Sequence, residues 1–188
     1  MSDLTITNAG VSVTPNSGGN SGKGYRKIIR LNPTISTTAY VAGDACFNSI
    51  EIPNAVCGEG GVSRLESVTI RVETQSGLAG GDIVLLFSQK AQANLHDTLS
   101  TAVDITVDEL KDSNILGAWS IDTSDNGDVI NDTNIGSAGH PSAGNGGSNC
   151  LYLQAESGST SVYVSGIANG SWTASATDGL EIILNIEY

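Results

Sequence analysis

Two segments of this chain alternate apolar and polar residues, and they limit the possible fold more than any other feature. One is 65–74 (LESVTIRVET) and the other is 180–188 (LEIILNIEY). In the first, Val68, Ile70 and Val72 point to one side and the residues between them to the other. This two-residue period is typical of antiparallel strands with one buried face. Such a sheet needs a second layer to cover its apolar face.

Other apolar runs bounded by glycine or proline complete the set of expected strands. Residues 82–88 (DIVLLFS) form a continuous apolar run, so we expect a central strand that is buried on both faces. Thr106 and Glu109 fit a capping box and predict one short helix over 107–112. The remaining expected strands are 25–31, 47–52, 116–121, 129–135, 150–155 and 161–167, and 136–149 is expected to be the longest loop.

These elements predict an all-β protein, a two-sheet antiparallel sandwich of the jelly-roll type with one short helix. Residues 25–188 would form this single domain. The 188 residues suffice for a sizeable core. Residues 1–24 would form an extended N-terminal arm.

Charge is distributed unevenly along the chain. The net charge is −12. In the first 30 residues Asp3 is opposed by Lys23, Arg26, Lys27 and Arg30, so this stretch carries +3 and the remainder −15. An acidic domain argues against direct binding of nucleic acid. No apolar run is long enough to cross a bilayer, which argues against a membrane partner. The first residues do not resemble a signal peptide, so we expect synthesis in a cytoplasm.

The arm has too few apolar groups to fold alone. Ordering a segment of this length costs on the order of tens of kcal/mol. We therefore expect the arm to lie on its own body or, in preference, on a neighbouring subunit, where it would add an edge strand. Basic residues would seat the junction on an acidic protein surface, although a solvated basic strand edge is the alternative. The residues expected to bind this partner are Leu4, Ile6, Val11, Val13, Lys23, Arg26, Lys27 and Arg30.

Sequence motifs for cofactors and metals are weak. Residues 17–24 resemble a phosphate loop but lack its first glycine and its final Ser or Thr. Asp122–Asp128 follow the first half of a calcium loop, but Thr133 stands where a bidentate Glu is needed. We expect an acidic turn there, with weak calcium binding as the alternative. Three cysteines without CxxC spacing are expected to be buried and unpaired. No cofactor is expected.

Candidate catalytic and sugar-binding residues are scattered. His96 and His140 lack a nucleophile or metal-ligand context. Glu66, Glu73 and Glu156 could serve a glycosidase only if they converged. Of the two tryptophans, Trp119 is expected in the core, whereas Trp172 is expected at the surface as a possible sugar-stacking residue.

Several segments, in their order and spacing, resemble structural proteins of tailed bacteriophages. The resemblance covers about residues 38–188. The segments are 39–44 (AYVAGD), 50–56 (IEIPNAV), 60–70 (GGVSRLESVTI), 81–88 (GDIVLLFS), 114–121 (NILGAWSI), 151–156 (LYLQAE) and the closing L-x-I-x-L-x-I-x-Y pattern.

The resemblance implies a non-enzymatic virion protein, most simply a capsid decoration or cement protein on the outer surface of the head. Its expected partners are the major capsid protein or other virion subunits, and copies of itself in a homotrimer. A receptor-binding or glycan-binding sandwich of a head fibre or tail is the first alternative. A glycan hydrolase is the second.

Overall fold

The structure is a computed structural model that describes residues 25–73, 82–121 and 151–188 in full. Elsewhere it describes only the backbone of six short strands. These are β1 (Ile6–Asn8), β2 (Val11–Val13), β8 (Gly127–Ile130), β9 (Thr133–Ala138), β10 (Ser142–Ala143) and β11 (Gly147–Ser148).

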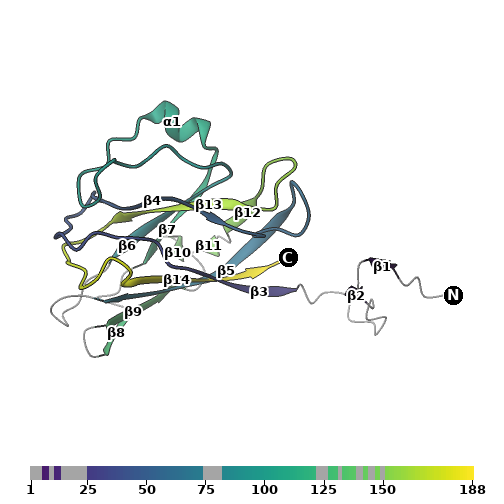
Figure 1. The fold of residues 1–188 in the computed structure, drawn as a ribbon, viewed down its shortest axis with the longest axis horizontal. Helices are drawn as coiled ribbons and strands as arrows, with labels where there is room; N and C mark the ends of the chain where they lie inside the picture. Colours follow the sequence, from purple (N-terminus) through teal and green to yellow (C-terminus); the bar gives the residue numbers. More distant parts are fainter. Residues whose placement is uncertain are drawn as a thin grey trace.

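Two antiparallel sheets pack face to face (Figure 1). The six-stranded sheet has the order β3-β14-β5-β9-β8, with β12 also paired to β5, and the four-stranded sheet has the order β4-β13-β6-β7. The elements described in full are β3 (Arg26–Leu31), β4 (Ala45–Ile52), β5 (Val62–Glu73), β6 (Ile83–Ser88), α1 (Val107–Asp112), β7 (Ile115–Ile121), β12 (Leu151–Gln154), β13 (Val162–Ala168) and β14 (Leu180–Glu187). The expected all-β sandwich is confirmed.

Strands β9 and β12 are two parts of one interrupted strand. β9 pairs with Val68–Glu73 of β5, and β12 pairs with Val62–Leu65 of the same strand. β14 occupies the opposite edge of β5. If β9 and β12 count as one, eight main strands follow each other as β3, β4, β5, β6, β7, β9/β12, β13 and β14. In these terms, and with the short strand β8 beyond β9 left out, the two sheets have the orders 1-8-3-6 and 2-7-4-5.

Alternation fills the core between the sheets. Leu180, Ile182, Leu184 and Ile186 of β14 are all fully buried, as the two-residue period predicts. β5 follows the same rule except at Glu66. Ser67 pairs with Asn185 and Leu65 pairs with Ile186, so Glu66 is an extra residue in the ladder. This bulge brings both Glu66 and Ser67 to the outer side of the sheet.

Residues 89–114, which we call the cap, cover the outer face of the four-stranded sheet. The cap connects β6 to β7 and contains α1, which lies outside β4 and β13 in Figure 1. The capping box is present: the Glu109 amide donates to the Thr106 hydroxyl, and the Thr106 amide donates to the Glu109 carboxylate. The helix over 107–112 is confirmed.

Several expectations about single segments are wrong. In β6, Val84 and Leu86 are only half-buried, so this strand is not fully buried on both faces. The single strand expected over 129–135 is instead the antiparallel pair β8 and β9. The expected loop over 136–149 contains the end of β9 and the paired strands β10 and β11.

In the arm, β1 and β2 pair with each other in an antiparallel two-stranded sheet. Ile6, Val11 and Val13 therefore lie in strands that pair with each other, and their expected docking on a neighbouring subunit stays a prediction. Leu4 and Lys23 lie outside the described residues.

Candidate functional site: the outer face of the six-stranded sheet

All four arginines of the chain lie on one face of one sheet. Arg26 and Arg30 are on β3, and Arg64 and Arg71 are on β5. On β3 the two arginines alternate with the buried Ile29, so they point away from the core. β14, which lies between β3 and β5, supplies glutamates to the same face. We call this outer surface of β3, β14 and β5 the arginine face.

One carboxylate joins two strands near the start of β14. Glu181 of β14 accepts a hydrogen bond from Arg30 of β3, with 2.7 Å between Nη1 and Oε1. Its other oxygen, Oε2, is 3.7 Å from Nε of Arg71 on β5. The three side chains form an Arg–Glu–Arg triad across three neighbouring strands.

A second cluster lies near the end of β14. Arg64 makes close ion pairs with both Glu66 and Glu187. Arg26 is 3.9 Å from Glu66 and 4.0 Å from Glu187. Glu66 can take part because the bulge turns it outward. A hollow of about 370 Å³ lies beside this cluster, lined by Arg26, Glu66, Ser67, Asn185 and Ile186.

The arginine side chains project while the glutamates are recessed. The exposed fractions of the side chains are 72% for Arg26, 58% for Arg30 and 51% for Arg71, but only 18% for Glu181. The ion pairs of Arg26 and Arg71 are too long to be hydrogen bonds. Solvent therefore meets guanidinium groups whose orientation is held from below by carboxylates.

Exposed apolar side chains accompany the arginines. Ile28 is 62% exposed and lies between Arg26 and Arg30 on β3, and Tyr152 of β12 is 60% exposed. Tyr152, Arg64, Glu187 and Arg26 lie side by side in register on the neighbouring strands β12, β5, β14 and β3. Arginine and tyrosine are enriched in protein interfaces, and both supply much of their binding energy.

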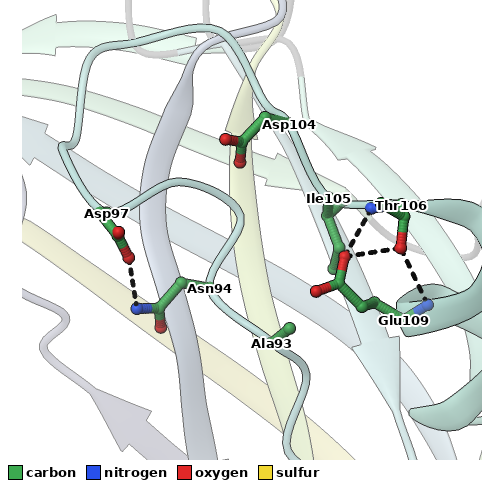
Figure 2. Close-up of a pocket in the computed structure, with 7 residues that line it drawn as sticks. All are labelled: Ala93, Asn94, Asp97, Asp104, Ile105, Thr106 and Glu109. Carbon is green, nitrogen blue, oxygen red and sulfur yellow. Dashed lines mark hydrogen bonds between the residues drawn. The ribbon is translucent and has the colours of Figure 1, made fainter.

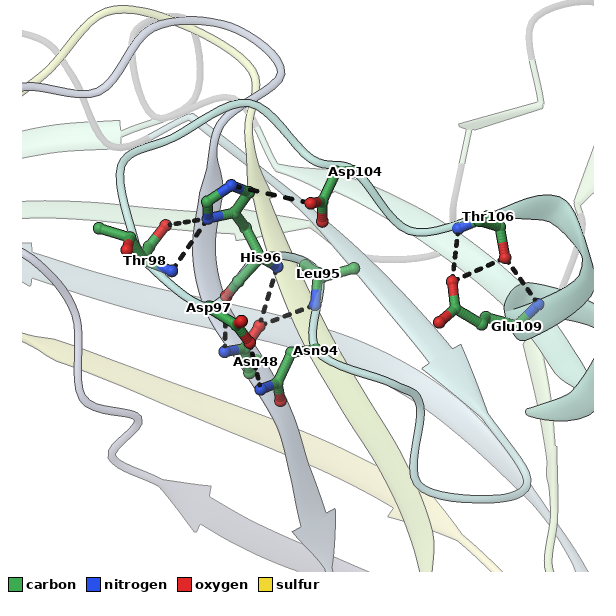
Figure 3. Close-up of polar contacts among 9 residues, drawn as sticks. All are labelled: Asn48, Asn94, Leu95, His96, Asp97, Thr98, Asp104, Thr106 and Glu109. Atoms are coloured by element: carbon green, nitrogen blue, oxygen red, sulfur yellow. Dashed lines mark hydrogen bonds and ion pairs between the residues drawn. The ribbon is translucent and has the colours of Figure 1, made fainter.

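The opposite outer face, on the four-stranded sheet, is closed by the cap. Asn48 of β4 accepts a hydrogen bond from the Leu95 amide at 2.8 Å and donates to the His96 carbonyl at 3.1 Å (Figure 3). Ser165 of β13 donates to the buried Gln92, and Leu95 is fully buried. These contacts come from neutral polar groups, in contrast to the ion pairs of the arginine face.

The cap also carries an acidic hollow of about 360 Å³ (Figure 2). Asp97, Asp104 and Glu109 line it, and Asp97 accepts a hydrogen bond from Asn94. The hydrogen bonds from Thr106 hold the pKa of Glu109 below its usual value. Among the residues that the structure describes, no three His, Cys, Asp or Glu side chains converge to hold a metal ion.

His96 takes part in local contacts of the cap. Its Nδ1 accepts a hydrogen bond from the Thr98 amide at 2.9 Å, and its Nε2 is 3.8 Å from Asp104 (Figure 3). This arrangement fixes the ring against the turn that follows it. The structure brings no serine or cysteine nucleophile to His96 within the described contacts. His140 lies outside the described residues.

Trp172 does not form a surface platform. It is only 6% exposed and stacks on Tyr40, with 4.5 Å between ring centroids. An isolated bridge between Tyr40 and Trp172 holds the two rings together. Burial raises the pKa of Tyr40 to about 12. The expectation of an exposed Trp172 is wrong, whereas Trp119 lies in the core as expected.

The candidate glycosidase carboxylates do not converge. Glu66 and Glu73 are seven residues apart on β5, which is about 23 Å at about 3.3 Å per residue. Paired glycosidase carboxylates lie within about 10 Å. Glu156 pairs with Lys90 at 3.1 Å.

Other predicted residues have varied positions. Lys27 donates to the Asn54 carbonyl at 3.2 Å rather than joining the arginine face. Cys46 is buried and Cys57 is exposed, so the expectation that Cys57 is buried is wrong; both are free thiols. Burial raises the pKa of Cys46. Residues 17–24, residues 122–126 and Cys150 lie outside the described residues.

Comparison with protein-family models found no match for this chain, and a search of curated proteins found no significant match. No helix in the described part of the chain is both long enough and apolar enough to cross a bilayer.

Proposed function

We propose that this chain is a non-enzymatic structural protein that binds another protein through its arginine face, and that its setting is the outer surface of a tailed-phage capsid. The observation that carries the proposal is the gathering of every arginine onto one open sheet face. A face of ordered arginines with exposed Ile28 and Tyr152 suits a protein partner better than a small molecule.

The phage setting rests on the sequence resemblance and is supported by the strand order. An eight-stranded sandwich built of two Greek keys is the jelly roll, an architecture used in viral capsid domains and also in unrelated lectins and cupins. The orders 1-8-3-6 and 2-7-4-5 agree with this architecture. A decoration protein would bind the major capsid protein or other virion subunits, and its own copies in a homotrimer.

The arm belongs to the same proposal. We expect residues 1–24 to dock on a neighbouring subunit and β3, the edge strand that follows them, to lie near that contact. Arg26 and Arg30 are ordered by glutamates of their own sheet, yet they project far enough to meet a partner as well.

The glycan-binding alternative loses its main residue because Trp172 is buried. The hydrolase alternative loses its carboxylate pair because Glu66 and Glu73 are far apart on one strand. Neither alternative has an observation in its favour among the described residues.

Location in the particle tests the proposal. Antibodies raised against the purified chain should label the heads of intact phage particles that encode it, in electron micrographs of negatively stained samples. Particles made without the chain should bind the purified protein when it is added back, and a chain lacking residues 1–22 should fold normally but bind at least about tenfold more weakly. Absence of the chain from purified particles would contradict the proposal.

A further inference from the structure

We propose that the cap of a second copy of this chain docks on the arginine face. This inference rests on the proposed function only for its setting, an assembly that contains several copies of the chain. The contact joins the exposed carboxylates of one surface to the projecting guanidinium groups of the other. Two copies of the chain supply both surfaces of this contact, so no other protein is needed for it.

The cap is the acidic member of the pair. Residues 89–114 contain five carboxylates and two lysines, for a net charge of −3. All five carboxylates are exposed: Asp97, Asp104, Asp108, Glu109 and Asp112. Of the lysines, Lys111 is 3.3 Å from Asp108, and Lys90 pairs with Glu156 outside the cap. The His96 ring, only 24% exposed, adds at most one further positive charge beside Asp104.

The arginine face presents the positive groups of the pair. The four arginines and the three glutamates that they pair with sum to +1, and Glu73, at the end of β5 on the same outer side, brings the face to zero in a chain whose net charge is −12. Because the glutamates are recessed, the groups that a partner would meet first are guanidiniums. Arg26 and Arg71 make only long ion pairs with their own glutamates, so their N–H donors remain for carboxylates of a partner.

Preorganisation favours such a contact. A mobile arginine loses side-chain entropy when it binds, whereas Arg30 is already held by Glu181 at 2.7 Å. Planar guanidiniums bind carboxylates with two parallel hydrogen bonds. Ile28 and Tyr152 add apolar area beside the charged groups.

The two surfaces lie on opposite sides of the sandwich. The cap covers the outer face of the four-stranded sheet, and the arginine face is the outer face of the six-stranded sheet (Figure 1). A contact between different patches on two copies is head-to-tail, and it forms a ring when successive rotations close. Patches on opposite sides of each copy favour an open series of copies over a closed ring of three.

Sedimentation of the full chain at low salt tests the contact. The wild type should associate as its concentration rises, and about 1 M NaCl, where charges are screened within about 3 Å, should abolish the association. The triple variant R30E/E181R/R71E reverses the triad while keeping its internal pairs. It should associate at least about tenfold more weakly. K111E changes the net charge by the same amount, but it makes the cap more acidic, so it should associate at least as well as the wild type.

Mixing two reversed variants distinguishes this contact from any other. D104K/D112K reverses the cap, and the substitution at position 112 places a positive charge favourably in the last turn of α1. Each variant alone should stay monomeric, and an equimolar mixture should associate because its reversed surfaces are again complementary. Circular dichroism melting of both variants shows that they are folded. A mixture that stays monomeric, or a triad-reversed variant that associates like the wild type, would overturn the inference, whether or not the chain is found in a particle.

Discussion

The two outer faces of the sandwich differ in what covers them and in the groups that they carry. The face of the four-stranded sheet is covered by the chain's own cap, held through neutral hydrogen bonds at Asn48 and Ser165. No segment among the described residues covers the face of the six-stranded sheet at β3, β14 and β5, and this face carries ion pairs with projecting guanidiniums. A covered face contributes to stability, whereas an open face with ordered arginines is available to a partner. Substitutions on the covered face should therefore affect folding, and substitutions on the open face should affect association.

Two asparagines on outer sheet surfaces give the largest expected contrast. Asn48→Ala leaves the Leu95 amide and the His96 carbonyl without their partners, and should lower the free energy of unfolding by about 2 kcal/mol. Asn185→Ala on the open face removes one hydrogen bond to Ser67 and should cost less than about 1 kcal/mol. Urea unfolding measures both. Equal losses would contradict the contrast.

Two substitutions to valine that remove a hydroxyl group sharpen the comparison. Ser165→Val adds volume beneath the cap and removes the bond to the buried Gln92, so it should cost about 1–2 kcal/mol. Thr69→Val on the half-buried outer side of β5 should change stability by less than about 0.5 kcal/mol. Thermal melting of the two variants measures the difference. A larger loss for Thr69→Val would mean that the open face is packed like the covered one.

The Arg–Glu–Arg triad should contribute little to the stability of the isolated chain. Glu181→Gln removes the charge that holds Arg30 and Arg71, and we expect a loss of less than about 1 kcal/mol that disappears at high salt. Association, by contrast, should weaken clearly because the guanidiniums become mobile. A strongly destabilised variant with unchanged association would show that the triad serves folding alone.

The smallest expected effect concerns the capping box at low pH. The pKa of Glu109 is lower in the folded chain than in the unfolded chain. The stability that the ionised Glu109 gives the folded chain is therefore present above the unfolded pKa, and it is lost as the pH falls through the folded pKa. The amides at the start of α1 should then exchange faster in acid, with little change in β5. Glu109→Gln should remove this pH dependence. Hydrogen exchange followed by NMR between pH 5 and about pH 3 tests the prediction.

Sequence alone could predict the strands but not the surfaces that they form. The alternation in β5 and β14 identifies inward residues because burial imposes a two-residue period. The outward direction of Arg71 follows from the same period. That Arg71 meets Arg30 through Glu181 depends on β14 lying between β3 and β5, a long-range pairing with no local signal. The only sign of the bulge in the sequence is that the buried residues Leu65 and Val68 are three positions apart, where regular alternation would give two. This bulge turns Glu66 outward.

The covering of the four-stranded sheet by the cap could not be predicted from the sequence for a related reason. The cap is held by single polar groups far apart in the chain, such as Asn48 and Leu95, and no periodicity marks them. The burial of Trp172 leaves no local sequence signal, because Tyr40, the ring on which it stacks, lies far away in the chain. Apolar periodicity determines which side of a strand is buried against the other sheet. It does not determine what covers the outer side.

Chemical footprinting of arginine tests the central claim most directly. Phenylglyoxal modification of the isolated chain and of the chain in its assembled form, followed by mass spectrometry, compares the accessibility of Arg26, Arg30 and Arg71 in the two states. All three should react in the isolated chain, because their side chains are more than half exposed. On assembly their reaction should slow by at least about tenfold, because the centre of a protein interface excludes water. Equal reactivity of the three arginines in both states would contradict the claim that the open face is the binding surface.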